Sequence, residues 1–251
     1  MTAPGLAGRD PAPASRGRLR GSLPVGGVVP FTTVDLPGRL AAVAFLQGCP
    51  WRCGYCHNPH LQASDARPAV EWEAWLDWLD GRRGLLDAVV FSGGEPTAHA
   101  GLEAAMRAVA SRGFAIGLHT GGAYPRRLAG VLGLCEWIGF DVKAPESDYA
   151  AITGVEDSGT AAFASLRAVL ASGVAHEVRT TVHPSLLSGE RLLRLAAELA
   201  AAGVRRWVLQ PFRPDGCADG SLVEAAPRGA IIDRALVDEL RDHVPRVDVR
   251  A

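Results

Sequence analysis

The sequence of 251 residues lacks an apolar run of about 18 residues, the length that a helix needs to cross a membrane. It also lacks an excess of basic charge, because its net charge is -1, which argues against a nucleic-acid-binding surface. Residues 1–20 are rich in Pro, Gly, Ala and Arg and lack the apolar stretch of a signal peptide. We therefore expect a cytoplasmic protein with no membrane or nucleic-acid partner, made of a disordered leader (1–20) and a single domain (21–251).

Lysine is almost absent from the chain. Lys143 is the only lysine among 26 basic side chains, and all the others are arginine. An ammonium group is a compact point charge, whereas a guanidinium is a planar fork. A lone lysine in such a sequence therefore indicates a position where arginine cannot do the same work.

Cysteine is scarce, and its distribution is uneven. There are five cysteines, an odd number, and three of them (Cys49, Cys53 and Cys56) fall within eight residues. This pattern is not that of a disulfide framework and is typical of the reducing cytoplasm. Because no fourth cysteine follows nearby, three thiolates could hold three irons of a 4Fe–4S cluster and leave the fourth iron open to a reacting molecule.

A zinc site is the main alternative for this cluster of cysteines. Structural zinc sites have four protein ligands, and His57 could supply the fourth. The protein would then be a non-enzymatic zinc-binding adaptor, although the spacing differs from the usual pair of C-x2-C motifs. Cys135 lies at the end of an apolar helical stretch, where a buried inert thiol is the default, and Cys217 lies in a Pro/Asp/Gly loop.

Apolar runs of strand length alternate with amphipathic helical stretches along the chain. The runs are 40–47, 85–92, 114–120, 137–143, 177–182 and 205–210. Near-continuous apolar runs suit strands that are buried on both faces, and their alternation with helices predicts a parallel sheet. Six units are too few for a closed barrel, so we predict an α/β fold with a partial, open (β/α)6 barrel. A small hairpin or edge strand is expected before the first unit, and a helix with a short strand after residue 225.

Polar residues follow each of these runs. They are the three cysteines, Ser92 to Pro96, His119 to Gly122, Asp141 with Lys143, Arg179 with His183, and Gln210 with Arg213. The carboxyl ends of parallel strands form the edge of the sheet where active sites are built. In the Gly93-Gly94-Glu95-Pro96 turn, the glycines allow close approach to a ligand, and Glu95 supplies a carboxylate that can face an ammonium group.

Together, these motifs resemble the radical S-adenosylmethionine (SAM) superfamily. The resemblance is closest to the anaerobic ribonucleoside-triphosphate reductase activating proteins, which are glycyl-radical-enzyme activases, and it covers about residues 25–220. The segments that carry it are VPFTTVDLPGRLAAVAFLQGCPWRCGYCHNPHL, VVFSGGEPT, GLHTGGAYP, FDVKAP, YAAITGV, EVRTTVHPSLL and LQPFRPDGCAD.

This resemblance implies a reaction and its cofactors. Cys49, Cys53 and Cys56 would hold one 4Fe–4S cluster, and SAM would bind the open iron through its amino and carboxylate groups. Reductive cleavage of SAM would yield a 5′-deoxyadenosyl radical that takes a hydrogen from a glycine of the partner reductase. Such enzymes are reduced by a flavodoxin- or ferredoxin-type donor. The cofactor supplies the chemistry, and the protein supplies positioning.

The resemblance also implies roles for single residues. Gly93, Gly94 and Glu95 match the turn that holds the methionine ammonium, and Tyr55 matches an aromatic residue against the adenine. Asp141 and Lys143 match an Asp-x-Lys segment beside the SAM carboxylate.

Other candidate residues follow the third, fifth and sixth runs. Arg179 matches a basic position near SAM, and together with Lys143 it is a candidate catalytic residue. Thr120, Gln210 and Arg213 are further candidates for cofactor binding. The chain departs from the pyruvate formate-lyase activases at His119, where those proteins have an aspartate that helps to bind a monovalent cation.

Two other radical SAM functions stay open at this stage. One is an activase for a different glycyl radical enzyme. The other is an enzyme that acts on a small molecule, similar to the small deazaguanine-forming synthases. The segments VPFTTVDLPG and RTTVHP favour the reductase activase.

Overall fold

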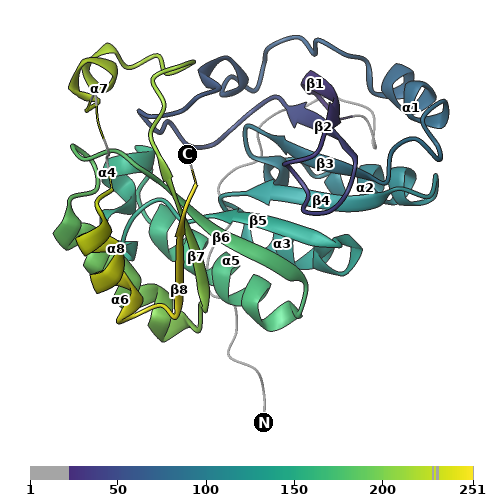
Figure 1. Cartoon of the computed structure of the whole chain (residues 1–251). Coiled ribbons are helices and arrows are strands. Elements are labelled where there is room, and N and C mark those ends of the chain that lie inside the picture. The colour runs from purple at the N-terminus through teal and green to yellow at the C-terminus, as the bar shows by residue number, and fades with distance from the viewer. Residues whose placement is uncertain (1–22, 228, 230–231, 251) are drawn as a thin grey trace.

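A computed structural model describes residues 23–227, 229 and 232–250 of the chain. The predicted leader (1–20) lies outside the described residues. The described part forms an eight-stranded sheet whose strands follow the order of the chain from β1 to β8, with β1 at one edge and β8 at the other (Figure 1). The strands are β1 (Val25–Thr32), β2 (Ala41–Leu46), β3 (Ala88–Gly93), β4 (Ala115–Thr120), β5 (Trp137–Asp141), β6 (Ala175–Val182), β7 (Arg206–Pro211) and β8 (Arg246–Val249).

The sheet is a partial, open barrel, as the sequence predicts. β1 and β2 are antiparallel, which confirms the edge hairpin before the first unit, and each later pair of neighbouring strands is parallel. The expected short strand near the C-terminus is β8, and it pairs with β7 in parallel. The parallel part of the sheet therefore has one strand more than the six predicted units. Lys143 falls two residues beyond the end of β5, on a loop rather than in the strand.

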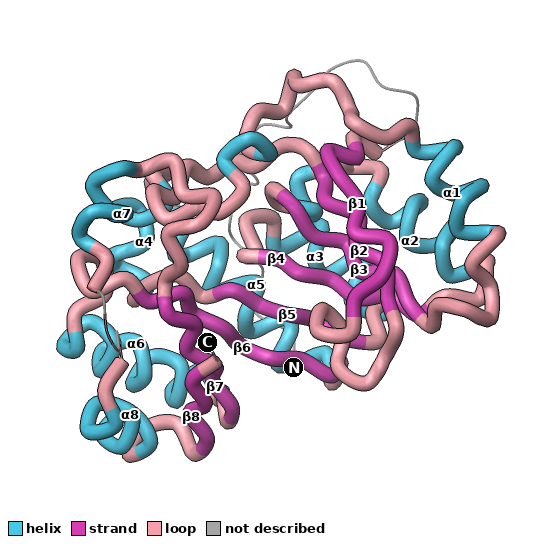
Figure 2. Tube along the Cα trace, turned by 45° about the horizontal axis from the view of Figure 1, so that its top comes forward, coloured by secondary structure: helices cyan, strands magenta, loops and turns pink. Residues whose placement is uncertain are grey.

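The principal helices pack on one face of the curved sheet, as Figures 1 and 2 show together. The helices are α1 (Trp72–Asp80), α2 (Leu102–Ala110), α3 (Pro125–Val131), α4 (Tyr149–Thr153), α5 (Ser158–Ser172), α6 (Gly189–Ala202), α7 (Gly220–Ala225) and α8 (Arg234–Arg241). Short 3-10 turns are η1 (Pro59–Leu61), η2 (Pro96–Ala98), η3 (Leu132–Leu134) and η4 (Glu146–Asp148). α4 and α7 were not expected, because five or six residues are too few to display a helical period. In the described part of the chain, no helix has the length and apolarity that a membrane crossing needs.

Helix α6 shows how local sequence sets these elements. The hydroxyl of Ser188 accepts a hydrogen bond from the backbone N–H of Arg191 at the start of the helix, and Gly203 adopts a left-handed conformation after its end. Between these signals, leucines recur at a spacing of three or four residues, so that Leu192, Leu195 and Leu199 are buried against the sheet. Apolar residues at a similar spacing are buried in α1, α2 and α8, which explains why these helices could be predicted from the sequence.

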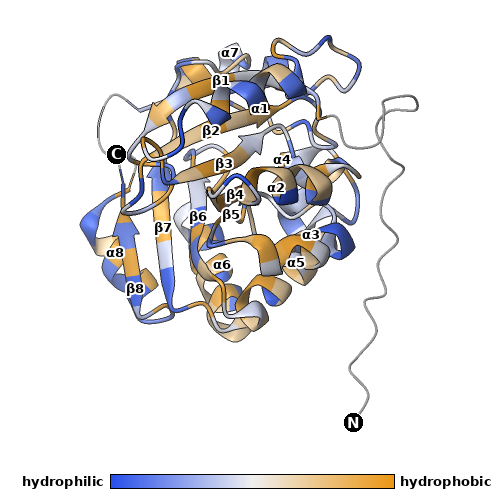
Figure 3. Ribbon diagram, turned by 90° about the vertical axis from the view of Figure 1, so that its right-hand side faces the viewer, coloured by the Kyte–Doolittle hydropathy of each residue, from blue (hydrophilic) through white to orange (hydrophobic). Residues whose placement is uncertain are grey.

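Apolar side chains fill both faces of the central strands. Figure 3 shows β2 and β3 mostly in hydrophobic colours, while the helices carry both polar and apolar segments. The main core lies between the sheet and the helices. A smaller cluster on the concave face contains Leu36 from the β1–β2 loop, packed with Val43, Val90 and Trp137. Burial on both faces is why these strands read as continuous apolar runs in the sequence.

Two helical glycines, Gly159 and Gly130, differ in how closely the rest of the protein packs against them. A Cβ atom at Gly159 in α5 would collide with the carbonyl oxygen of Glu146, whereas a Cβ at Gly130 in α3 would meet no atom within 4 Å. We expect Gly159→Ala to lower the free energy of unfolding by about 1–3 kcal/mol through overpacking. Gly130→Ala should be neutral, or stabilise by up to about 1 kcal/mol, because alanine has the higher helix propensity. Urea unfolding followed by circular dichroism measures both, and equal effects of the two variants would contradict this account.

Candidate active site

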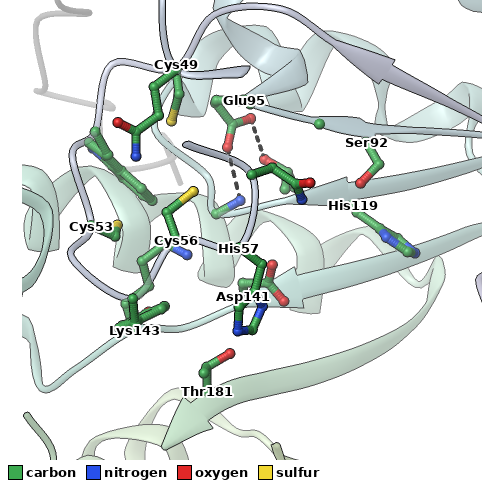
Figure 4. Close-up of a pocket in the computed structure, with 18 residues that line it drawn as sticks. Cys49, Cys53, Cys56, His57, Ser92, Glu95, His119, Asp141, Lys143 and Thr181 are labelled. Carbon is green, nitrogen blue, oxygen red and sulfur yellow. Dashed lines mark hydrogen bonds between the residues drawn. The ribbon is translucent and has the colours of Figure 1, made fainter. Parts of the chain in front are cut away.

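One cavity opens at the carboxyl ends of the parallel strands. It encloses about 820 Å³ of space, its solvent-filled mouth included. Figure 4 shows side chains from the cysteine-bearing loop on one side of the cavity and side chains from the strand ends on the other. The predicted site residues that line it are Cys49, Cys53, Tyr55, Cys56, Gly93, Gly94, Glu95, Thr120, Asp141 and Lys143.

The loop that carries the three cysteines (residues 48–62, here called the cysteine loop) is closed by backbone hydrogen bonds. Gly48 N–H donates to the carbonyl of Leu61 (2.7 Å), and Cys49 N–H donates to that of Gln62 (3.1 Å). Gly48 has a φ of +105°, a conformation that favours glycine. Cys56 N–H donates to the carbonyl of Cys53 (3.1 Å) in a tight turn. The loop therefore holds three part-buried free thiols against one cavity.

The thiol arrangement fits a cluster better than a single metal ion. Among the described residues, no three His, Cys, Asp or Glu side chains converge on a point where one ion could bind. His57, the fourth ligand of the zinc alternative, stacks on Phe212 and has its Nε2 atom 2.9 Å from the carbonyl oxygen of Arg213. Three thiols spread around one void are the donor set that iron–sulfur clusters use.

Burial keeps the thiols of Cys49 and Cys53 protonated in the metal-free protein. It raises the pKa of Cys49 to about 12, with a further contribution from the negative charge of Glu95. Burial likewise raises the pKa of Cys53. Metal ligands must be thiolates, so binding of iron at this loop has to release protons.

The Gly-Gly-Glu turn after β3 is packed too tightly to accept other residues. A Cβ atom at Gly93 would collide with the backbone of Leu46, and one at Gly94 would collide with the carbonyl of Gly48. Gly93 also has a φ of +113°. The turn thus places its backbone directly against the start of the cysteine loop, where Glu95 N–H donates to the Gly48 carbonyl (2.9 Å).

The carboxylate of Glu95 is buried, with the residue 2% exposed. Its Oε1 accepts hydrogen bonds from the backbone N–H (3.0 Å) and hydroxyl (2.6 Å) of Thr97 and from the hydroxyl of Thr120 (2.6 Å). Its Oε2 accepts from Gly121 N–H (2.9 Å), and Figure 4 shows part of this network. Glu95 lines the cavity as expected, but four protein donors already bind its oxygens, and one of them is Thr120.

Asp141, in the lining of the cavity, forms an ion pair with Arg179. Arg179 Nε donates to Asp141 Oδ1 (2.8 Å), and its guanidinium packs on Gly139 and lies 5.9 Å from the Trp137 ring centre. Burial opposes ionisation of Asp141, but the positive charges of Arg179 and Lys143 outweigh it and lower the pKa of Asp141. The arginine therefore keeps Asp141 ionised.

His119 lies beside this pair and lines the cavity. Its Nε2 is 2.9 Å from the carbonyl oxygen of Asp35, which can only accept, so Nε2 carries the proton in the neutral ring. Burial, and then the charge of Arg179, lower the pKa of His119 to about 4. The position where the resembling activases have an aspartate thus holds a neutral imidazole.

Lys143 stands on the loop after β5. Its backbone N–H donates to the hydroxyl of Tyr149 (2.9 Å), and its ammonium lies 5.7 Å from the ring centre of Trp51 and 5.8 Å from that of Tyr55. Burial opposes the charge, but the electrostatic effects of Tyr55, Cys53 and Asp141 outweigh it and raise the pKa of Lys143 well above its usual value. The lone lysine is therefore a charged group at the cavity wall.

Three predicted site residues do not line the cavity. Arg179 reaches it only through Asp141, Gln210 lies in β7 beside Thr181 of β6, and Arg213 is exposed and offers its backbone carbonyl to His57. The lining also includes residues that were not among the predicted site residues: Trp51, His57, Asn58, Gln62, Ser92, His119, Gly121 and Thr181. Alternation along β6 could have indicated Thr181, because residues 179 and 181 face the same side of a strand.

Comparisons with known proteins agree with this geometry. The model of the radical SAM superfamily matches residues 43–192, more than half of the chain. The chain belongs to the radical SAM superfamily. This assignment confirms the expected family, and the open barrel is its fold. Members of this superfamily in general use SAM and a 4Fe–4S cluster, which the three thiols and the cavity could accommodate.

Relatives within the radical SAM superfamily are distant in sequence. A protein of Methanocaldococcus jannaschii with a provisional name as a glycyl-radical enzyme activating enzyme is 28% identical over 205 residues, which are 78% of this chain and 82% of the relative. The structure of SuiB from Streptococcus suis bound to the precursor peptide SuiA has a TM-score of 0.61 at 13% identity and covers 83% of this chain. This chain covers 48% of SuiB, about half its length. QueE from Escherichia coli has a TM-score of 0.53 at 17% identity and covers 92% of this chain and 94% of its own.

The pKa of His119 predicts a pH dependence of stability in this radical SAM enzyme. The unfolded chain protonates His119 near pH 6.5, whereas the folded protein keeps it neutral down to about pH 4. Lowering the pH through this window therefore favours the unfolded chain. Relative to His119→Gln, which cannot take up this proton, the wild type should lose stability as the pH falls from about 6.5 to about 4. Urea unfolding of both metal-free proteins across this window measures the difference, and a difference that does not change with pH would contradict the assignment.

Proposed function

We propose that this protein is an activase that removes a hydrogen atom from a glycine of an anaerobic ribonucleoside-triphosphate reductase. The observation that carries the proposal is a single cavity whose walls hold three free thiols, the Gly-Gly-Glu turn and the charged groups of Asp141 and Lys143. The relative from Methanocaldococcus jannaschii, which aligns with most of the chain, supports glycyl-radical chemistry. The segments VPFTTVDLPG and RTTVHP support the reductase as the partner.

In this proposal, Cys49, Cys53 and Cys56 hold one 4Fe–4S cluster, and SAM binds beside it. When bound, the cluster and SAM together supply the electron and the 5′-deoxyadenosyl radical. A flavodoxin- or ferredoxin-type protein delivers the electron. Because the cofactors carry this chemistry, the chain itself has to bind, orient and shield them.

The charge and polarity of each cavity residue indicate which part of SAM it would bind. The ionised Asp141 suits an ammonium group, and the charged Lys143 suits a carboxylate, so the two bind the opposite charges of an amino acid. The glycines at 93 and 94 let the ligand approach the backbone. Tyr55, whose ring borders the cavity, gives the adenine an apolar face. Arg179 acts on SAM indirectly, by keeping Asp141 ionised and in place.

A direct test is the formation of a glycyl radical. The protein, reconstituted with iron and sulfide under anaerobic conditions, is incubated with SAM, a reductant and a candidate anaerobic reductase, and the mixture is examined by electron paramagnetic resonance. A glycyl doublet on the reductase is the expected result. Cleavage of SAM without a doublet on any candidate partner would overturn the activase proposal and favour a small-molecule substrate. A zinc-loaded protein that does not cleave SAM would overturn both.

Variants of two cysteines separate cluster ligands from other thiols. We expect Cys53→Ala to lose most of the bound iron, the visible absorbance of the cluster and SAM cleavage, because two thiols and an open position hold a cluster poorly. Cys135→Ala is the matched control, since Cys135 lies outside the cavity and donates to the carbonyl of Val131 (3.4 Å). It should retain all three properties. Iron analysis and absorbance spectra measure the difference, and iron retention by Cys53→Ala would contradict the ligand assignment.

A further inference from the structure

Trp51 anchors the cysteine loop between Cys49 and Cys53. The residue is 4% exposed although it lies on a loop. Its ring rests on Gly121, where an added Cβ atom would collide with it, and it meets the ring of Tyr149 edge to face at a centroid distance of 6.0 Å. These contacts join the cysteine loop to the segment after β4 and to α4.

The same ring is one of two aromatic rings that contact the Lys143 ammonium. The ammonium lies 5.7 Å from the ring centre of Trp51 and 5.8 Å from that of Tyr55, both within the distance of about 6 Å at which a cation is attracted to an aromatic face. Tyr149, which packs on Trp51, accepts the backbone N–H of Lys143 through its hydroxyl oxygen (2.9 Å). Three aromatic residues therefore hold both the main chain and the ammonium of this lysine.

Within the part of the chain that the structure describes, no carboxylate forms a salt bridge with this ammonium. Asp141, whose charge acts on Lys143, forms its salt bridge with Arg179. Lys143 lines the cavity, so its charge is available to an anionic ligand. A half-buried cation that contacts two rings and has no salt-bridge partner among the described residues is suited to bind a carboxylate.

The contact with two rings also accounts for the single lysine of the chain. Arginines in the described part make cation–π contacts with one ring each: Arg82 over Trp78, Arg127 over Tyr124 and Arg179 over Trp137. A planar guanidinium stacks on one face, whereas a compact ammonium can lie between two rings. Lys143, in contrast to these three arginines, contacts two rings.

We propose that Trp51 is a positioning residue which, together with Tyr55, fixes the Lys143 ammonium where it binds the carboxylate of SAM. This inference rests on the proposed function, because it takes SAM as the ligand of the cavity. Trp51 itself does not have to touch SAM. It fixes the position of the Lys143 ammonium, and an arginine at position 143 would place the positive charge elsewhere.

The test compares SAM with decarboxylated SAM, which lacks the carboxylate. Binding of both ligands to the reconstituted protein is measured by equilibrium dialysis, without turnover. We expect Trp51→Leu to weaken the binding of SAM by about tenfold, as loss of a desolvated cation–π contact would, and to leave the binding of decarboxylated SAM nearly unchanged. Lys143→Arg should show the same selective loss, and Trp51→Phe, which keeps a smaller ring, should lie between Trp51→Leu and the wild type.

Trp78→Leu is the matched control, since Trp78 holds Arg82 and does not line the cavity. It should leave the preference for SAM unchanged. Equal weakening of both ligands by Trp51→Leu and Trp51→Phe, or an unchanged preference, would overturn the role of Trp51. Iron content measured in parallel identifies any loss of the cluster. Failure of the wild type to bind SAM would instead refute the proposed function.

Discussion

The buried carboxylate of Glu95 is the interaction on which the geometry of the site depends. Two of its four hydrogen bonds join the turn after β3 to Thr120 and Gly121 at the end of β4, and the other two come from Thr97. The backbone N–H of the same residue donates to Gly48, where the cysteine loop begins. A buried carboxylate is costly unless donors satisfy it, so this network locks two strand ends and the loop together. The thiols face the strand ends because Glu95 ties these segments to one another.

Charge is distributed around the cavity in a definite order. Arg179 pairs with Asp141 from the interior of the barrel, and the neutral ring of His119 lies beside them. This leaves the second cation, Lys143, to be held by aromatic rings rather than by a carboxylate. Beside Glu95, whose oxygens are taken by protein donors, Asp141 and Lys143 bring one anionic and one cationic group to the cavity, and this pair matches the two opposite charges of an amino-acid moiety. The proposed binding of SAM and the proposed role of Trp51 both follow from this order.

The open sheet bears on the proposed partner. The eight strands do not close into a ring, and β1 and β8 stay at opposite edges. The cavity lies at the carboxyl ends of the strands and opens to solvent. A glycine on another protein has to enter such a site as a segment of backbone, so an open mouth suits a macromolecular substrate better than a sealed pocket would.

The sequence alone determined the strand–helix alternation, the cysteine loop and the Gly-Gly-Glu turn, because each depends on residues that are close together along the chain. Apolar runs, caps and glycine positions are local signals, and they predicted the partial barrel and most of the cavity lining. The tertiary structure alone decided that Arg179 turns to Asp141 instead of the cavity and that Glu95 binds Thr120. It also decided that Trp51 packs on Gly121 and faces Lys143. These contacts join residues far apart in the sequence. Their energies depend on burial and on which charged groups pair with one another, and a local sequence pattern encodes neither.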